Sequence, residues 1–275
     1  MPELPEVETI KETLKQQILG ERIADVKINL PRLIRTPKDP HLFRNRSVGL
    51  TITDITRRGK YLIFHLPPYR LISHLRMEGR YSIHRAGDPI EKHTHLIFLF
   101  QSGRELRYKD VRQFGTFDLV SEGEEHLPLG LTRLGIEPLT PAFTLEAFHR
   151  LLTKPTKRNI KAFLLDQKNV AGLGNIYVDE ALFHAGIDPE RPVSSLTAAE
   201  RERLFAGIEE VLRQGIRAGG ATVRTYRNAS GEMGYFQLQL FVYGREGKPC
   251  YRCGNPIERI VVQGRGTHVC SHCQH

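Results

Sequence analysis

Long apolar runs are absent from this sequence. None approaches the ~18 consecutive apolar residues of a membrane-spanning helix, so we exclude a protein that crosses a membrane. The N-terminal segment MPELPEVETIKETL is acidic and amphipathic, and it lacks the basic and then apolar layout of a secretory signal. We therefore expect a cytosolic protein. Its 275 residues, of which 40% are hydrophobic, predict one large domain or two and argue against a disordered chain.

Cysteine is scarce, and all four copies lie between positions 250 and 275. In a reducing compartment, such clustering favours metal ligation over disulfides. The spacing Cys250-x2-Cys253, sixteen residues, then Cys270-x2-Cys273 lets four thiolates meet at the tetrahedral geometry that zinc prefers. The protein fills all four positions and leaves none for a substrate, so we predict one structural zinc ion. A small stabilising ribbon without a further role is the simplest interpretation of this module in isolation.

Positive charge exceeds negative charge. The chain has 40 Lys and Arg against 31 Asp and Glu, which gives a net charge of +9. Residues 215–275 contain more than half of this excess. This balance favours a polyanionic partner such as DNA, although many basic proteins bind no nucleic acid.

The first part of the chain is predicted to be one helix followed by strands. Apolar residues recur at helical spacing between positions 5 and 19, with proline and glutamates in the first turn and Gly20 directly after. From position 21 to about 120, short β-branched and aromatic segments alternate with turns. This pattern predicts a β-sandwich or a β-barrel.

A helical pattern follows the Pro- and Gly-rich stretch 127–141, and a second domain is expected to begin there. The segment 219–235 is rich in Gly, Ser, Thr and Asn, and we expect a mobile loop. A compact β module with the cysteines comes last. The predicted domains are 1–130, 131–234 and 235–275.

Two segments of the second half are candidates for phosphate binding. The turn GLGN at 172–175 joins two predicted helices, and the free N–H groups of the second helix form an anion site. A plain helix–helix turn is the alternative, but Lys157, Arg158 and Lys161 on the preceding segment favour phosphate. Asn175 is expected to cap the second helix and to donate to a phosphate oxygen.

The second candidate is the hairpin between the cysteine pairs. Gly264 and Gly266 flank Arg265 in what should be a tight turn. A guanidinium at a rigid tip suits a phosphate clamp, although arginines at such tips are often only solvated.

These features together resemble the formamidopyrimidine-DNA glycosylase family. The shared motifs are PELPEVET at the start, GKYL around Lys60, HLRMEGR at 74–80, YKDVRQFG at 108–115, GLGNIYVDE at 172–180 and the four-cysteine finger. They occur in the family's order over nearly the whole chain. The resemblance implies an α+β fold, with an N-terminal helix plus β-sandwich domain and a C-terminal helical domain bearing a helix-two-turn-helix and a β-hairpin zinc finger. It also implies double-stranded DNA with oxidised bases or abasic sites as partner, and a monomer.

The resemblance further implies a bifunctional DNA glycosylase and abasic-site lyase of base excision repair. After removal of Met1, the secondary amine of Pro2 attacks C1′ of the damaged nucleotide. An α-amino group has a pKa near ~8, so a neutral fraction is available without a separate base. Glu3 acts as general acid on the sugar ring oxygen, Lys60 contacts a flanking phosphate and assists proton transfer, and Arg265 takes part in the second elimination. Glu6 has a supporting role. Pro2 alone, without the motif, is an ordinary residue after the initiator Met.

The implied DNA contacts divide into two groups. Met77, Arg112 and Phe114 fill the space left when the damaged base is flipped out. Without the resemblance, Met77 and Phe114 would be interpreted as core residues. The remaining contacts are made by His74, His93, Lys157 and Asn175 to the backbone and by a main-chain acceptor near Ala221 that distinguishes 8-oxoguanine from guanine.

Two alternatives remain open at this point. The sister endonuclease VIII family shares the Pro-Glu start and the zinc finger but prefers oxidised pyrimidines; the PELPEV opening and the three void-filling residues favour the purine enzyme. A non-enzymatic zinc-ribbon DNA-binding protein is the other alternative. It predicts DNA binding without strand incision, and it leaves Pro2, Glu3 and Lys60 unexplained.

Overall fold

The structure is a computed structural model, and it describes residues 1–221 and 234–275. The chain forms two compact units. Unit 1 comprises Met1–Thr132 and Gly219–Tyr235, and unit 2 comprises Arg133–Ala218 and Phe236–His275. Most of the segment predicted to be a mobile loop, 219–235, lies outside the described residues.

Unit 1 begins with helix α1, Leu4–Ile18. Pro5 lies in its first turn, where a missing N–H costs no hydrogen bond, and Gly20 follows the helix with a φ of 80°. The apolar stripe of Val7, Ile10, Leu14 and Ile18 is buried in the core of the unit. The amphipathic pattern therefore predicted the helix to within one residue at each end.

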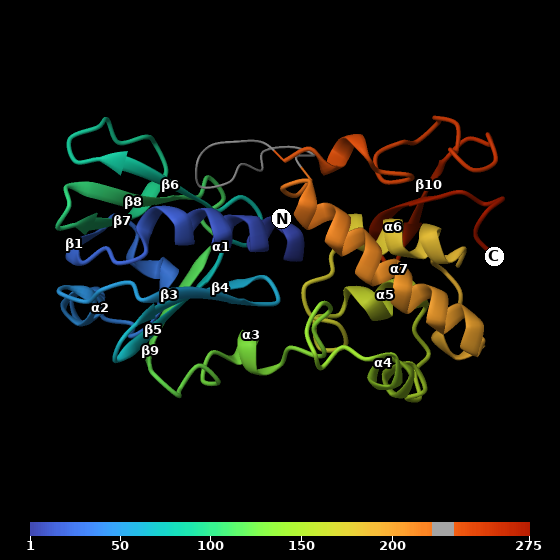
Figure 1. The fold of residues 1–275 in the computed structure, drawn as a ribbon, viewed down its shortest axis with the longest axis horizontal. Coiled ribbons are helices and arrows are strands. Elements are labelled where there is room, and N and C mark those ends of the chain that lie inside the picture. Colours follow the sequence, from blue (N-terminus) through green and yellow to red (C-terminus); the bar gives the residue numbers. More distant parts are fainter. Residues whose placement is uncertain (222–233) are drawn as a thin grey trace. The chain divides into compact units, whose positions relative to one another are not determined.

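Two sheets follow, and they form the predicted β-sandwich (Figure 1). The four-stranded sheet has the order β1-β7-β8-β6, with the bounds Ile23–Ile28, Thr94–Phe100, Arg104–Lys109 and Arg80–Arg85. The five-stranded sheet has the order β2-β9-β5-β4-β3, with the bounds Ile34–Thr36, Thr116–Ser121, Tyr69–His74, Tyr61–Leu66 and Asp54–Arg58. Neighbouring strands are antiparallel except β2 and β9, which are parallel.

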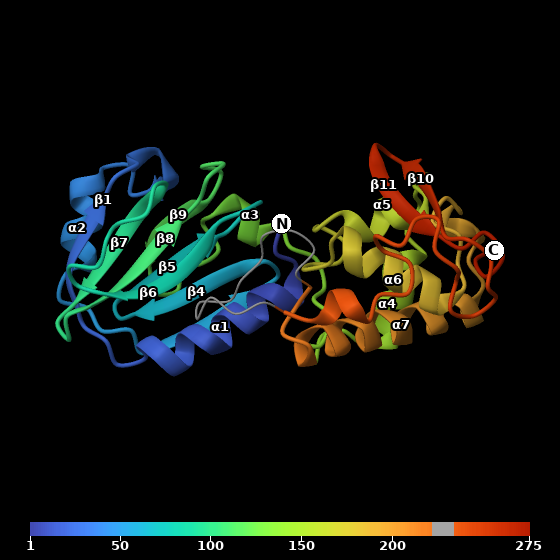
Figure 2. The same ribbon diagram turned by 90° about the horizontal axis from the view of Figure 1, so that it is seen from above.

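Helices cover the sandwich at two places. Helix α1 packs against β3 and β4, and helix α2, Pro40–Ser47, packs against β1 and β2 (Figure 2). Asp39 caps α2 by accepting a hydrogen bond from the His41 amide. The short helices η1, Pro31–Leu33, and α3, Leu129–Thr132, complete the unit. Buried polar side chains lie at the start of α1 and at the ends of β5 and β8, namely Glu3, Glu6, His74 and Asp110.

Unit 2 is helical and ends in a hairpin. Helix α6 packs against α7, α5 and strand β11. The bounds of its helices are α4 Leu145–Leu152, α5 Ile160–Leu165, α6 Asn175–Ala185 and α7 Ala198–Arg217, with the short helices η2 Val193–Ser195 and η3 Phe236–Leu238. Strands β10, Glu258–Val262, and β11, Arg265–Val269, form the antiparallel hairpin.

The predicted α+β fold is confirmed: a helix and a β-sandwich come first, and a helical domain with a β-hairpin follows. Among the described residues, none of the helices combines the length and the apolar character needed to cross a bilayer.

Candidate functional site

The start of α1 gathers buried carboxylates at the chain terminus. Glu3 is 4% exposed and Glu6 is 2% exposed, while Pro2 is partly exposed. The backbone N–H of Glu3 donates to Oε2 of Glu6 at 2.7 Å, and the backbone N–H of Ala221 donates to Oε1 of Glu6 at 2.8 Å. Glu6 therefore uses both oxygens to hold two backbone segments that are far apart in the sequence.

The amine at the chain terminus lies within the electrostatic field of this group. Burial is the largest cause that lowers the pKa of the Met1 amine, and the Lys60 cation acts in the same direction. The carboxylates that oppose this shift are those of Glu3, Glu6 and Glu78. The structure therefore brings together the terminus and two predicted site residues, Glu3 and Lys60.

Lys60 comes from the turn between β3 and β4. Gly59 adopts a φ of 57° in this turn, and Lys60 itself is 4% exposed. Arg57, on the same segment, donates to Glu8 of α1 at 2.8 Å. The segment before β4 is thus held against α1 by the ion pair of Arg57 with Glu8.

The loop between β5 and β6 contains Met77, and the loop between β8 and β9 contains Arg112 and Phe114. Met77 is 40% exposed and Phe114 is 52% exposed, so the interpretation of these two as core residues is wrong. The guanidinium carbon of Arg112 lies 5.1 Å from the centre of the Phe114 ring. The preceding residues, Arg76 and Gln113, have φ angles of 55° and 57°, a strained conformation typical of functional loops.

His74 ends strand β5 as a buried neutral ring. Its Nδ1 accepts a hydrogen bond from the Arg76 backbone N–H at 2.9 Å, so the ring proton is carried by Nε2. Burial, assisted by the cations of Arg76 and Lys60, lowers the pKa of His74 to about 3. His93, the other predicted histidine contact, is partly exposed and has a φ of 68°.

In unit 2 the structure corrects three sequence-based expectations. Gly174, not Asn175, occupies the N-cap position of α6, and no side chain caps this helix. Asn175 instead donates from Nδ2 to the Gly266 carbonyl at 2.8 Å. The tight turn of the hairpin lies at Gln263 and Gly264, with φ angles of 50° and 74°, and Arg265 is the exposed first residue of β11.

The third correction concerns Lys161. This side chain is fully buried, so it is not available to a phosphate. Its ammonium donates to Oδ1 of Asp179 at 2.6 Å and to Oγ1 of Thr267 at 2.7 Å. Asp179 also accepts from the His268 backbone N–H at 2.9 Å. Lys161 therefore connects α5, α6 and the hairpin, whereas Lys157 remains exposed.

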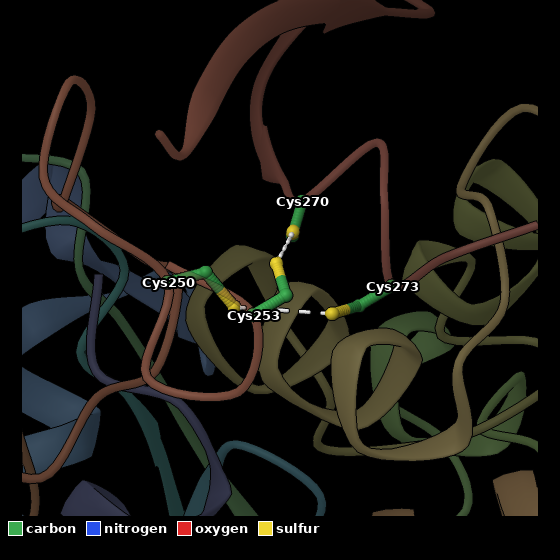
Figure 3. A group of neighbouring side chains, drawn as sticks. All are labelled: Cys250, Cys253, Cys270 and Cys273. Carbon is green, nitrogen blue, oxygen red and sulfur yellow. Dashed lines mark hydrogen bonds between the residues drawn. The ribbon is translucent and has the colours of Figure 1, made fainter. Parts of the chain in front are cut away.

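The four cysteines converge as their spacing predicted (Figure 3). Their sulfur atoms all lie within 4.8 Å of one another, and Cys253 Sγ lies 3.5 Å from Cys270 Sγ. Four thiolates at Zn–S distances of about 2.3 Å require sulfur separations of this size. Among the described residues, this is the one group of His, Cys, Asp and Glu side chains that could hold a metal ion.

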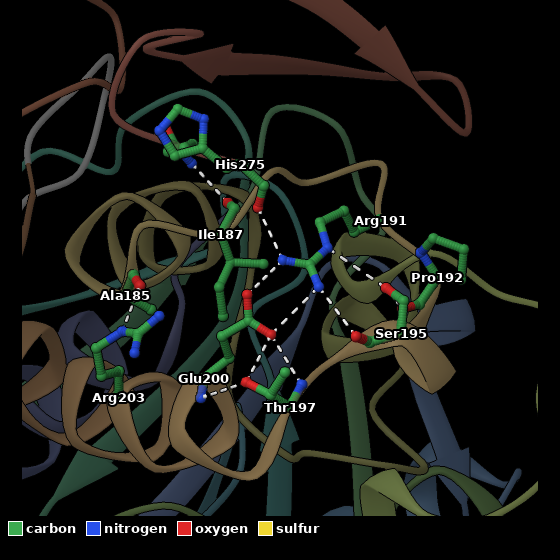
Figure 4. Close-up of polar contacts among 10 residues, drawn as sticks. Ala185, Ile187, Arg191, Pro192, Ser195, Thr197, Glu200, Arg203 and His275 are labelled. Carbon is green, nitrogen blue, oxygen red and sulfur yellow. Dashed lines mark hydrogen bonds and ion pairs between the residues drawn. The ribbon is translucent and has the colours of Figure 1, made fainter.

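The chain end after the cysteines is anchored in unit 2 (Figure 4). Arg191 donates to the His275 carbonyl at 2.9 Å and to Oε1 of Glu200 at 2.5 Å. The guanidinium of Arg191 lowers the pKa of Glu200 to about 2. Glu200 also forms the capping box of α7 with Thr197, so the Arg191 side chain connects the start of α7 to the end of the chain.

Comparisons with known proteins agree with this architecture. The model of the formamidopyrimidine-DNA glycosylase N-terminal domain matches residues 1–117, the model of the H2TH domain of these enzymes matches 134–227, and that of a zinc finger found in FPG and IleRS matches 247–275. The formamidopyrimidine-DNA glycosylase of Geobacillus kaustophilus is 54% identical over 274 residues, with 100% of each chain covered. That of Shouchella clausii is 52% identical over 274 residues, with 100% of this chain and 99% of the relative covered.

Solved structures give the same result. A complex between a Lactococcus lactis FPG mutant and a Fapy-dG containing DNA has a TM-score of 0.92 and 44% identity, with 99% of both chains covered. A complex of MutM with DNA containing carbocyclic 8-oxo-G has a TM-score of 0.91 and 42% identity, with 99% of both chains covered. The chain belongs to the formamidopyrimidine-DNA glycosylase family and is a DNA glycosylase. The cysteine cluster is its zinc finger, and the predicted structural zinc is confirmed.

Proposed function

We propose that this protein removes oxidised purines, namely 8-oxoguanine and formamidopyrimidines, from double-stranded DNA and then cleaves the strand at the resulting abasic site. The observation that carries the proposal is the convergence of Glu3, Glu6 and Lys60 at the chain terminus, where burial lowers the pKa of the Met1 amine. Relatives whose solved structures contain Fapy-dG, an abasic site or 8-oxo-G in DNA support the substrate class. We further propose that it acts as a monomer in the bacterial cytoplasm.

The chemistry begins when Met1 is removed and the amine belongs to Pro2. A lowered pKa increases the neutral fraction of an amine at neutral pH, and a neutral amine is a nucleophile. The Pro2 nitrogen forms a bond to C1′ and loses its proton, and the bond from C1′ to the base breaks as the base takes up a proton. Glu3 gives a proton to the sugar ring oxygen, so the sugar opens and a cationic iminium forms at C1′.

Strand cleavage follows from the iminium. The cation acts as an electron sink and acidifies the neighbouring C2′ proton, so loss of that proton expels the 3′ phosphate. A second elimination expels the 5′ phosphate. We assign phosphate binding during these steps to Lys60 and Arg265, because a cation near each leaving phosphate stabilises the charge that develops on it.

The exposed residues suit DNA binding. Met77 and Phe114 present apolar side chains that can occupy the space of the extruded base, and Arg112 can hydrogen-bond the unpaired cytosine. Backbone contacts are assigned to four further residues, His74, His93, Lys157 and Asn175. Because His74 is neutral with its proton on Nε2, we expect it to donate a hydrogen bond to phosphate without adding a charge.

Recognition of the damaged base is assigned to main chain at Ala221. Guanine has an acceptor at N7, whereas 8-oxoguanine has a donor there, so one carbonyl oxygen can distinguish them. The Ala221 amide is held by Glu6, and Ala221 is 4% exposed. This bond fixes the peptide group between Gly220 and Ala221 next to helix α1.

The test is borohydride trapping on a duplex that contains 8-oxoguanine opposite cytosine, followed by mass mapping of the adduct. We expect a covalent adduct on Pro2, and none on an undamaged duplex. A duplex with an oxidised pyrimidine tests the endonuclease VIII alternative, and faster trapping on it would favour that specificity. Tight binding without any adduct would favour the non-enzymatic alternative. Full base release and strand cleavage by a Pro2→Gly variant would contradict the mechanism.

A further inference from the structure

Asp110 is a buried carboxylate that the proposed chemistry does not use. It follows strand β8 and precedes the segment 111–115, in which Arg112 and Phe114 are exposed, and its own exposed fraction is 0%. Its Oδ2 accepts the backbone N–H groups of Phe114 at 2.9 Å and Gly115 at 2.8 Å. Its Oδ1 accepts the backbone N–H of Arg112 at 3.1 Å. One side chain thus accepts hydrogen bonds from three backbone N–H groups of the segment that contains Arg112 and Phe114.

The main chain of Asp110 forms a second set of contacts. Its N–H donates to the His93 carbonyl at 3.1 Å, and its carbonyl accepts from the Gln113 N–H at 3.2 Å. Nε2 of His95 lies 2.9 Å from the same carbonyl oxygen. Asp110 therefore connects the segment 111–115 to the backbone at His93, which is another proposed DNA contact.

Tyr108 extends this group to the Met77 connection. Its buried hydroxyl donates to Oδ2 of Asp110 at 3.3 Å. Gly79 and Gly115 pack against the same hydroxyl, since a Cβ added to them would lie 2.2 Å and 1.7 Å from its oxygen. Any larger residue at either position would displace the ring. The two connections that carry Met77 and Phe114 therefore meet at one buried pair, Tyr108 and Asp110.

We propose that Asp110 is a positioning residue for the void-filling side chains. It holds the Arg112–Phe114 segment in one shape before DNA arrives, and through Tyr108 it keeps this segment aligned with Met77. A segment that is ordered in advance loses less conformational entropy when it enters the duplex. This inference rests on the proposed function, because it takes Met77, Arg112 and Phe114 as the residues that replace the extruded base.

The experiment compares Asp110→Asn with Asp88→Asn. The amide keeps one acceptor oxygen but presents an NH2 group to backbone N–H donors, so at least one of the three amides loses its partner. Asp88 is a matched control, because its Oδ2 accepts one backbone N–H, from Arg85 at 2.8 Å, on an exposed turn of the same unit. For Asp110→Asn we expect base release from an 8-oxoguanine:cytosine duplex to slow by about tenfold or more, as for a lost positioning contact. The preference for cytosine over adenine opposite the lesion should also decrease.

Two further readouts separate positioning from a general loss of structure. Trapping of Pro2 on a single-stranded abasic oligonucleotide needs no void filling, and in Asp110→Asn it should stay within about twofold of the unaltered protein. If Asp110 acts in part through Arg112, the double variant Asp110→Asn/Arg112→Ala should lose less than the product of the two single losses. Additive losses in the double variant, or unchanged base release and opposite-base preference in Asp110→Asn, would overturn the inference.

The outcomes remain distinguishable from a failure of the proposed function. If the unaltered protein forms no adduct on any DNA, the proposed function fails, whatever Asp110 does. If Asp110→Asn does not fold, amide hydrogen exchange in the unaltered protein replaces it. Slow exchange at Phe114, whose side chain is exposed, supports a preformed shape, and exchange at the rate of an unstructured peptide overturns it.

Discussion

The burial of His74 determines its charge. Its Nδ1 is occupied by the Arg76 amide, and the neighbouring cations Arg76 and Lys60 oppose protonation, so the ring stays neutral far below the ordinary pKa of histidine. A group of this kind makes folding depend on pH, because the unfolded chain binds a proton that the folded chain rejects. The effect operates between the unfolded pKa of 6.5 and the folded pKa of about 3.

We therefore expect a His74→Gln variant to resist acid better than the unaltered protein. The folded pKa is lowered, so stability falls as pH decreases from 6.5 toward 3, by up to about 1.4 kcal/mol for each pH unit. Urea unfolding followed at pH 7, 5.5 and 4.5 measures this slope, with the exposed His126→Gln as control. Equal slopes for His74→Gln and the unaltered protein would contradict the expectation.

Glu6 is the second residue whose substitution gives a defined result. Its two oxygens accept the Glu3 and Ala221 amides, and glutamine offers only one oxygen at this place. Glu6→Gln should lower the free energy of unfolding by about 1–3 kcal/mol, the cost of a buried donor without a partner. Glu12→Gln, on the exposed side of the same helix, is the control for chemical denaturation. A change for Glu6→Gln no larger than that for Glu12→Gln would show that the two contacts are not maintained in solution.

At the scale of elements, the hairpin β10–β11 is held by a buried ion pair. Lys161 on α5 and Asp179 on α6 have fully buried side chains, and both contact the β11 segment, Lys161 at Thr267 and Asp179 at His268. Such a pair stabilises little compared with apolar packing, but removal of one partner leaves a buried charge without compensation. We expect the orientation of Arg265 to depend on this arrangement, because Arg265 precedes the contacted residues on the same strand.

Lys161→Met should therefore destabilise unit 2 by about 3–5 kcal/mol, whereas Arg158→Met, which breaks the exposed pair with Asp166, should cost about 1 kcal/mol or less. In folded Lys161→Met protein, we expect the product of the second elimination to decrease relative to that of the first, because Arg265 loses its fixed position. Thermal unfolding and gel analysis of the cleaved strand measure the two effects. An unchanged product ratio would show that the position of Arg265 does not depend on this ion pair.

Element prediction succeeded where the pattern is local. The apolar stripe and end residues of α1 predicted its bounds, and the x2 spacing of the cysteine pairs predicted their convergence. Strand β2 has only three residues and forms by parallel pairing with β9, about eighty residues later, so its sequence contains no periodicity to detect. Helix α2 had a detectable start in Asp39 and Pro40, yet it lies within a stretch dominated by strand patterns.

The candidate site was predictable only in part. Lys161 looked like one more surface cation in a basic segment, because its partners Asp179 and Thr267 are distant in the sequence. The exposure of Phe114 was likewise not predictable, because its segment folds around the Asp110 carboxylate, which accepts its backbone N–H. Residue roles came from the family's motifs, since composition and spacing alone left Pro2 as an ordinary second residue.

At the scale of the whole molecule, the two units should respond differently to loss of metal. The finger's small core consists of Phe183, Val242 and Ile257 together with two of the cysteines, so zinc contributes directly to folding there. Unit 1 has its own large core and no described residue of the zinc site.

Chelation should therefore loosen residues 247–275 and the adjoining end of α6 while unit 1 keeps its protection. Hydrogen exchange read by peptide mass, with and without a chelator, measures this, and chelator already saturated with zinc is the control. DNA incision should be lost together with the protection of the finger. A uniform increase in exchange along the chain would instead indicate that the two units unfold as one.

The Glu6 carboxylate makes two distant events thermodynamically reciprocal. It raises the pKa of the terminal amine and also accepts the Ala221 amide, which is 215 positions away in the chain. Movement of residue 221 that releases this bond changes the field at the amine, and by linkage the protonation of the amine changes the free energy of that movement by the same amount. The protonation of the terminal amine and the position of Ala221, the residue proposed to read the base, are therefore coupled variables, and a shift in one can be measured through the other.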